Sequence, residues 1–144
     1  MALSQLNGIY DPLGLLTPFT VKGKILMRDL WTLQYDWDTP LAENVRNEWI
    51  AFFHEMSSVP ELKFNRCVKP AAAIGDPTLV IFSDASKHAY GACAYIRWEL
   101  QSGAFESQLF ASKSRVAPLR VETIVRLELA AAIPSKRLGI SIEN

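Results

Sequence analysis

The sequence lacks a long hydrophobic run, a secretion signal and a paired-cysteine motif. No apolar stretch approaches the roughly 20 residues that a helix needs to cross a bilayer. The first residues, Met1–Tyr10, have neither the charged start nor the apolar centre of a signal peptide. Cys67 and Cys93 stand alone, which is typical of reduced thiols. We therefore expect a soluble, intracellular and cytoplasmic protein that has no membrane partner.

The sequence also lacks a net charge and a zinc motif. Its 15 basic and 15 acidic residues cancel, so no global positive field indicates nucleic-acid binding. His54 and His88 occur at no recognisable metal spacing, which argues against zinc. The charge is uneven only between residues 111 and 127. The basic residues there are Lys113, Arg115, Arg120 and Arg126, against the single acid Glu122. This strip either faces phosphates or is ordinary solvated surface.

What the sequence does contain is typical of a globular protein. Hydrophobic residues make up 49% of the chain and charged residues 21%. The 144 residues suffice for one ordinary domain or for two small ones. The mean hydropathy of +0.08 is rather apolar for a small soluble protein. We interpret it as the mark of a piece whose buried surfaces face other parts of a longer chain.

The first part, residues 1–70, is predicted to be helical. A threonine followed by proline is a helix-start signal, and it occurs at Thr17-Pro18 and again at Thr39-Pro40. Apolar residues recur at helical spacing after each signal, although Gly23 weakens the first helix. We expect three tryptophans to hold these helices together in a core, namely Trp31, Trp37 and Trp49. Residues 57–60, with Pro60, should end the second helix.

The second part, residues 78–144, is predicted to form strands and then a helix, after a linker at 71–77 that contains Gly75 and Pro77. An unbroken apolar run at 79–82 predicts a strand that is covered on both faces. The ranges 89–98 and 108–112 predict a hairpin joined by a turn. Pro118 should open a helix, and Pro134 should kink or end it, because its ring clashes with the preceding turn.

Two acids are candidates for chemistry. Asp84 directly follows an apolar strand, where a charge is costly unless it lies at an exposed strand end or binds a cation. Glu128 lies one helical turn from both Ile124 and Ala131, so we expect it to point toward the sheet. Two carboxylates that converge repel each other, and Mg²⁺ between them would relieve the repulsion. The alternatives are a turn residue at 84 and an exposed helix residue at 128.

Several motifs, in order along nearly the whole chain, resemble BEL/Pao-type LTR retrotransposons. The segment Ile9–Pro18 is similar to the Asp-Pro-Leu-Gly segment downstream of the reverse transcriptase palm in that family. The further motifs are Lys24–Leu26 with Leu30-Trp31, Asp36–Asp38, Phe82–Ser86, Ala111–Pro118 and Arg126–Ala131. Each is modest alone, but their order makes the match specific.

This resemblance implies an α/β (α+β) fold and a function. Residues from Leu3 to about Pro70 would be a thumb or connection region. The rest would begin an RNase H-like domain, as an incomplete sheet of three antiparallel strands with its first helix. Asp84 and Glu128 match the first two catalytic acids of RNase H folds, and both would bind Mg²⁺. The implied partners are an RNA–DNA hybrid and the rest of the Pol polyprotein, within a retroelement particle. The resemblance also makes three basic residues candidate contacts to the nucleic-acid backbone, namely Lys113, Arg115 and Arg120.

The sequence departs from that pattern in its later acids. No aspartate follows Asp84, and Glu143 is the only acid after Glu128. The two remaining catalytic acids therefore have no counterpart, and we expect a fourth strand and all beyond it to be missing. No Tyr-x-Asp-Asp motif is present, so no polymerase site is expected. We predict a Pol fragment that is inactive alone.

Two other functions remain open. A noncatalytic scaffold, or an interaction module retained by a host, would suit a chain whose strand at 79–82 is left at a sheet edge. An aspartic peptidase is prompted by Asp84-Ala85-Ser86 and by the peptidase name that this family region has carried. That chemistry requires glycine where Ser86 stands and a second facing aspartate.

Overall fold

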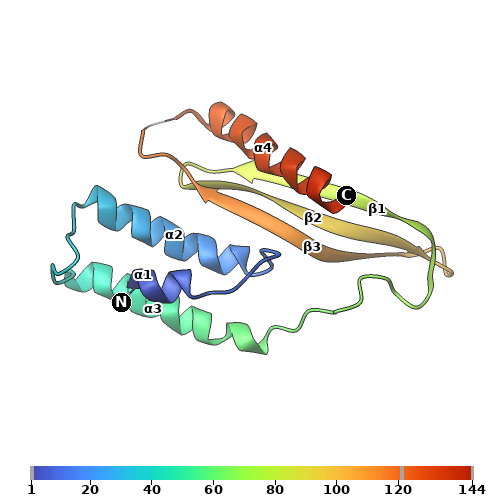
Figure 1. Ribbon diagram of the computed structural model, residues 1–144, viewed down its shortest axis with the longest axis horizontal. Helices are drawn as coiled ribbons and strands as arrows, with labels where there is room; N and C mark the ends of the chain where they lie inside the picture. The colour runs from blue at the N-terminus through green and yellow to red at the C-terminus, as the bar shows by residue number, and fades with distance from the viewer. Residues whose placement is uncertain (1, 121, 144) are drawn as a thin grey trace.

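The computed structural model describes residues 2–120 and 122–143, and its fold is mixed α and β. Figure 1 shows a group of helices beside a sheet that carries one further helix. The helices of the first part are α1 (Ala2–Asn7), α2 (Thr17–Thr32) and α3 (Glu43–Ser57), followed by a 3₁₀ turn at Val59–Glu61. The second part consists of β1 (Ala73–Ala85), β2 (Ala89–Leu100), β3 (Phe105–Val116) and α4 (Ile124–Glu143). This confirms the predicted fold class.

The core of the helical part is small and lies between α1, α2 and α3. Leu6, Trp49 and Phe52 are its buried residues. Gly23 allows the helices to approach, because a Cβ at this position would lie 2.6 Å from Cζ of Phe52 and 2.7 Å from a methyl group of Leu6. The glycine that weakens the sequence pattern of α2 is therefore required by packing.

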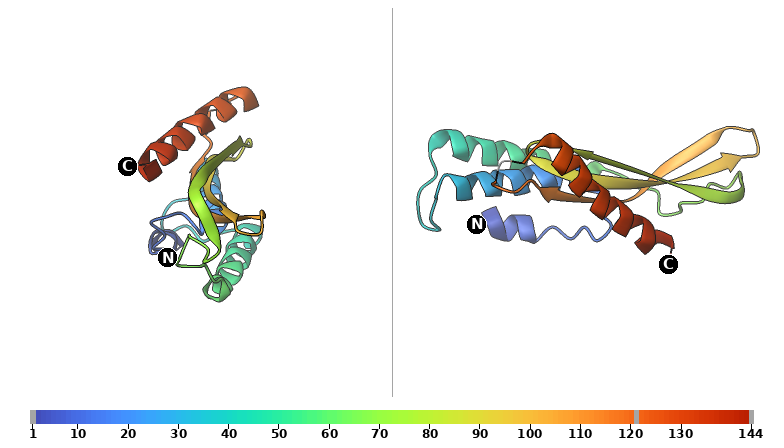
Figure 2. Two further views of the ribbon diagram at one scale, coloured as in Figure 1. Left: turned by 90° about the vertical axis from the view of Figure 1, so that its right-hand side faces the viewer. Right: turned by 90° about the horizontal axis from the view of Figure 1, so that it is seen from above.

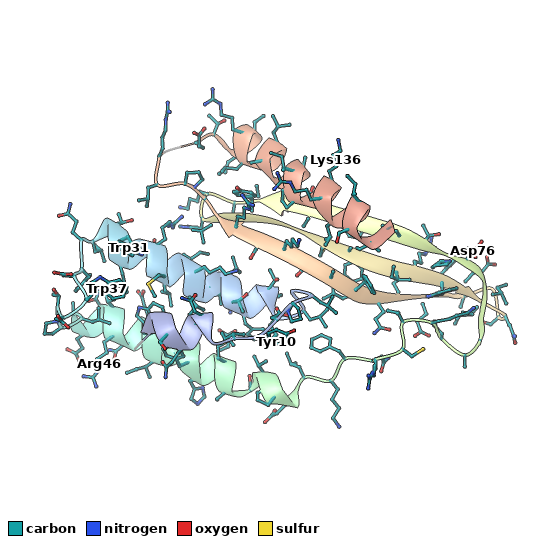
Figure 3. The ribbon with its side chains drawn as sticks, viewed as in Figure 1. Tyr10, Trp31, Trp37, Arg46, Asp76 and Lys136 are labelled. Carbon is teal, nitrogen blue, oxygen red and sulfur yellow. The ribbon has the colours of Figure 1, made fainter. Side chains whose placement is uncertain are left out.

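Two of the three tryptophans predicted in the core are on the surface. Trp31 is 60% exposed and Trp37 is 74% exposed, whereas Trp49 is buried. Leu30 packs on the core, and Trp31 follows it, so a rotation of about 100° turns Trp31 outward. Figure 3 shows Trp31 and Trp37 together at one end of the molecule, where their rings meet edge to face at 6.3 Å. For Trp31 the prediction was wrong because hydrophobicity alone does not fix the helix phase. Trp37 lies in a turn between α2 and α3 and belongs to neither helix.

Of the two helix starts predicted from Thr-Pro signals, the first agrees with the structure and the second lies a few residues too early. Helix α2 begins at Thr17, with proline in its first turn, as predicted. Its threonine makes no capping hydrogen bond; instead the carboxylate of Asp11 accepts the N–H groups of Leu15 and Leu16, at 2.9 and 2.8 Å. Helix α3 begins only at Glu43, after the second Thr-Pro signal, and ends before Pro60 as expected.

The sheet is antiparallel and has the order β1-β2-β3, with β2 in the centre. All three strands are longer than predicted. Residues 73–77, expected as part of a linker, form the first part of β1, where the register with β2 shifts between Ile74 and Thr78. From Thr78 to Ala85 the pairing is regular, so successive side chains of β1 alternate between the two faces.

Helix α4 covers one face of the sheet, as the two views in Figure 2 show. Its Leu138 packs with three alanines of the sheet, namely Ala92, Ala94 and Ala111. Small side chains let the helix lie close. Pro134, expected to kink or end the helix, lies inside it and is buried on the side that faces the sheet. Tertiary packing therefore maintains a helix across a residue that removes one backbone hydrogen bond. In the described ranges, no helix is long and apolar enough to span a membrane.

Candidate functional site

Asp84 is the penultimate residue of β1, and its side chain is exposed. It pairs with Gly91 of β2, and its Oδ1 accepts the N–H of Ala85 at 2.7 Å. Phe82 shares its face of the strand, and the Phe82 ring lies 6.0 Å from that of Tyr95. Ile81, on the other face, packs against the core under α4. The side chain of Asp84 thus starts from the face of the sheet that α4 does not cover.

Glu128 lies in the second turn of α4 and is also exposed. The side of the helix that packs on the sheet is formed by Leu127, Ala131 and Leu138, each at most 3% exposed. Glu128 follows Leu127 and is rotated about 100° away from that buried stripe. The expectation that it points toward the sheet is therefore not met; it stands at the border of the packed side.

The two acids nevertheless lie at the same end of the sheet. Figures 1 and 2 show that α4 begins over the end at which β1 finishes, and that the two elements run in opposite directions. Ile81 meets α4 at Gly139, where its Cδ1 would lie 3.1 Å from an added Cβ. Asp84 lies about 10 Å farther along β1 than Ile81, at the rise of an extended strand. Glu128 lies about 16 Å before Gly139 along α4, at the rise of a helix. Because β1 and α4 run in opposite directions, both distances lead toward the same end of the sheet.

The structure therefore brings Asp84 and Glu128 to one end of the sheet but not onto one face. Within residues 2–120 and 122–143, no group of three or more His, Cys, Asp and Glu residues could hold a metal ion. A divalent cation near these two acids would be reached by one carboxylate from each side of the sheet layer.

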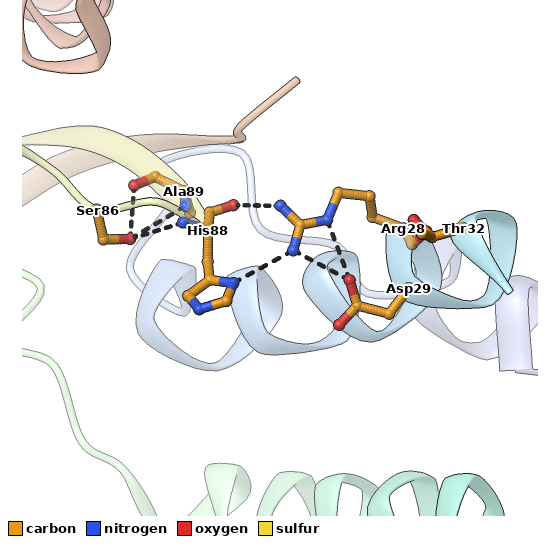
Figure 4. A network of polar contacts seen from close by, with 6 residues as sticks. All are labelled: Arg28, Asp29, Thr32, Ser86, His88 and Ala89. Carbon is orange, nitrogen blue, oxygen red and sulfur yellow. Dashed lines mark hydrogen bonds and ion pairs between the residues drawn. The ribbon is translucent and has the colours of Figure 1, made fainter. Parts of the chain in front are cut away.

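The turn that follows Asp84 is fixed by a polar network that the sequence did not reveal (Figure 4). The hydroxyl of Ser86 accepts the N–H groups of His88 and Ala89, at 3.2 and 3.1 Å. Arg28 of α2 reaches this turn and donates to the carbonyl of His88 at 3.1 Å and to its Nδ1 at 3.3 Å. Arg28 is the donor in both hydrogen bonds, because the guanidinium group has no acceptor atom. Asp29 accepts from the same guanidinium, at 3.0 Å, and so holds it in place.

The basic strip divides into two groups. Arg126 is neutralised, because its Nη1 lies 3.2 Å from an oxygen of Glu122. Lys113 and Arg115, at the end of β3, and Arg120, in the following loop, are exposed, and they form no ion pair with any other residue whose position is described.

Two more basic residues join this region without a sequence signal. Lys24 of α2 and Arg137 of α4 line a pocket together with Lys113 and Arg115. Each of them comes from a different helix, and neither belongs to a charge run in the sequence. Only the packing of both helices beside β3 places them together.

Comparisons with known proteins identify the family of this chain. A family model described as the Pao retrotransposon-like RNaseH-like domain matches residues 1–144. No curated protein and no solved structure matches the chain significantly.

Proposed function

The chain belongs to the family of Pao retrotransposon-like RNaseH-like domains, and from this premise we propose that it helps to bind and cut RNA–DNA hybrids within a Pol polyprotein. The family match covers the motifs that resemble BEL/Pao elements and confirms that resemblance. The proposed reaction is Mg²⁺-dependent hydrolysis of the RNA strand, carried out by the assembled polyprotein. The chain contributes two acids and a basic surface to that reaction.

The observation that carries this proposal is the position of Asp84 and Glu128 at one end of the sheet. Both carboxylates are exposed, and in the described part of the chain neither forms an ion pair. Carboxylate oxygens are the ligands that Mg²⁺ prefers, so both residues would hold the ion. The bound ion would polarise the phosphate and lower the pKa of an attacking water. Ser86 and Arg28 keep the turn beside Asp84 in a fixed position.

Two acids on opposite faces are too few for two-metal hydrolysis. That mechanism requires a cluster of carboxylates that fixes a pair of ions about 4 Å apart. We therefore expect weak metal binding and no cleavage by this chain alone, with the remaining ligands supplied by other parts of the polyprotein.

The basic residues beside this end of the sheet support hybrid binding. Lys113, Arg115 and Arg120 are exposed and unpaired among the residues described, so their charges are available to backbone phosphates. Such contacts position a duplex without reading its sequence.

Manganese relaxation tests the metal site directly. Mn²⁺ is added to the ¹⁵N-labelled chain, and the broadening of backbone amides is followed by NMR. We expect broadening around Asp84 and in the first turns of α4, with at least a fivefold loss of affinity in Asp84→Asn and in Glu128→Gln. Asp76→Asn is the matched control, because Asp76 is an exposed acid near the other end of β1 (Figure 3).

A parallel assay measures binding and cleavage of a labelled RNA–DNA hybrid. We expect binding that weakens with salt and no cleavage by the wild-type chain. Cleavage that disappears in Asp84→Asn would show that the chain is active alone. Equal broadening near Asp76, together with no hybrid binding, would overturn the proposal.

A noncatalytic scaffold is the second candidate, and two observations favour it. The two acids approach from different faces of the sheet, and the outer edge of β1 pairs with no other strand in the described ranges. A scaffold would bind neither Mn²⁺ nor hybrid, and its stability would not respond to Asp84→Asn. An aspartic peptidase has no such support, because no second aspartate follows Asp84.

A further inference from the structure

A pocket of about 400 Å³ lies at the edge of β3, where three distant parts of the chain meet. We call it the β3-edge pocket. Its walls come from the loop before α2 and α2 itself, from the end of β3, and from the middle of α4. In Figure 1, β3 passes between α2 on one side and α4 on the other. The residues that matter for its chemistry are Lys24, Lys113, Arg115 and Arg137.

The charge around the β3-edge pocket is strongly positive. Four basic side chains line it, and none of them forms an ion pair or a hydrogen bond with the residues that the structure describes. One acid, Asp11, also lines the pocket. Its two oxygens already accept the N–H groups of Leu15 and Leu16, so its charge is partly offset locally. An excess of uncompensated positive charge therefore surrounds this cavity.

We propose that the β3-edge pocket binds a phosphate group of a nucleic-acid backbone. A phosphate offers several acceptor oxygens and a full negative charge, which match the two arginines and two lysines that line the pocket. The choice of a nucleic-acid source rests on the proposed function. Lys113 and Arg115 line the pocket and are also exposed at the end of β3, so a strand held there would continue along this basic surface.

The β3-edge pocket does not include Asp84 or Glu128. Phosphate binding there would give a function to the contact between the helical part and the sheet with α4. Lys24 belongs to the helical part, whereas Arg137 belongs to the helix on the sheet. A phosphate bound between them would couple hybrid binding to the docking of α2 against β3. Removing the docking should therefore weaken phosphate binding even when all four cations are present.

Two titrations test the proposal on the full chain. Inorganic phosphate is added to the ¹⁵N-labelled protein, and amide shifts are expected to cluster at Ser114, Arg115 and Arg137. Hybrid binding is then measured by fluorescence anisotropy at several salt concentrations. The double variant Lys24→Gln/Arg137→Gln should bind hybrid at least tenfold more weakly, and its salt slope should fall by about 2.

A matched control separates the pocket from general electrostatics. Arg46→Gln/Lys136→Gln removes two positive charges from exposed helix positions, and neither residue lines the pocket or forms an ion pair in the described part of the chain. We expect less than a threefold loss of hybrid affinity in this control.

The outcomes distinguish this inference from the proposed function. If hybrid binds but both double variants weaken it equally, the pocket proposal is overturned and hybrid binding stands. If phosphate shifts the pocket amides but no hybrid binds, the proposed function fails and the site accepts free phosphate alone. Phosphate shifts that appear elsewhere also overturn the proposal.

Discussion

The hydroxyl of Ser112 in β3 donates a hydrogen bond to the backbone carbonyl of Gly14, which lies 98 residues earlier in the sequence. The N–H of Ser112 also donates to the carbonyl of Leu13, at 2.8 Å. These two bonds join the loop before α2 to the edge of the sheet. They cover part of an edge strand whose polar groups would otherwise be unpaired.

This contact gives a physical reason for the Asp-Pro-Leu-Gly segment. Asp11 fixes the loop through two backbone N–H groups, and Gly14 adopts a positive φ of 75° that few other residues tolerate. The segment therefore has a structural role. It shapes a loop that fits against β3.

Gly14→Ala should destabilise the protein more than any other glycine-to-alanine change at a positive φ. A Cβ on Gly14 would lie 1.9 Å from the carbonyl oxygen of Ser112, so the loop would have to leave β3. We expect a loss of about 3–4 kcal/mol in the free energy of unfolding, measured with urea. Gly103→Ala is the control, since Gly103 has a φ of 77° but open space around it, and it should cost only about 1 kcal/mol. Equal effects of the two changes would argue against the docking of this loop.

Truncating an exposed tryptophan should change the free energy of unfolding far less than truncating the buried one. Trp49→Ala empties the core of the helical part and should cost about 3–5 kcal/mol, because Trp49 is 4% exposed. Trp31→Ala removes a side chain that is 60% exposed and should cost less than about 1 kcal/mol. Thermal and urea unfolding, followed by far-ultraviolet circular dichroism, would measure both. A large loss in Trp31→Ala would mean that this side chain is covered in solution.

Arg28→Gln should loosen the turn beside Asp84. Arg28 donates to the carbonyl and the ring of His88, and the same carbonyl also accepts the N–H of Ala117 at 2.9 Å. We expect a loss of about 1 kcal/mol and faster hydrogen exchange at the Ala117 amide. Lys22→Gln is the control, because its ion pair with Glu55 is exposed and should contribute little. Unchanged exchange at Ala117 would count against the network.

Gly139 and Ile81 should be coupled in a double-mutant cycle. Alanine has a higher helix propensity than glycine by up to about 1 kcal/mol. In the wild type that gain is opposed, because the new Cβ would lie 3.1 Å from Cδ1 of Ile81. Ile81→Val removes that methyl group, so Gly139→Ala should be more favourable in the Ile81→Val protein by about 0.5–1 kcal/mol. Additive effects would indicate that α4 lies farther from β1 than the structure places it.

Local patterns in the sequence were sufficient for much of the fold. The unbroken apolar run at 79–82 and the small and aromatic residues at 89–98 identified strands, and the turn between 98 and 108 identified their hairpin. These signals depend on residues close in sequence, so they survive without tertiary information. The helix end that they allowed at Pro134 is not seen, because burial against the sheet maintains α4 across this residue.

The chemical character of the candidate site was also set by sequence, since Asp84 and Glu128 are acids that follow a strand and lie in a helix. The phase of α4 and the alternation of β1 decided where these side chains stand, and both depend on which face packs against a neighbour. The pocket lined by Lys24 and Arg137, and the bond from Ser112 to Gly14, join residues far apart along the chain. No local pattern encodes such contacts, because they exist only after the helices and the sheet have packed together.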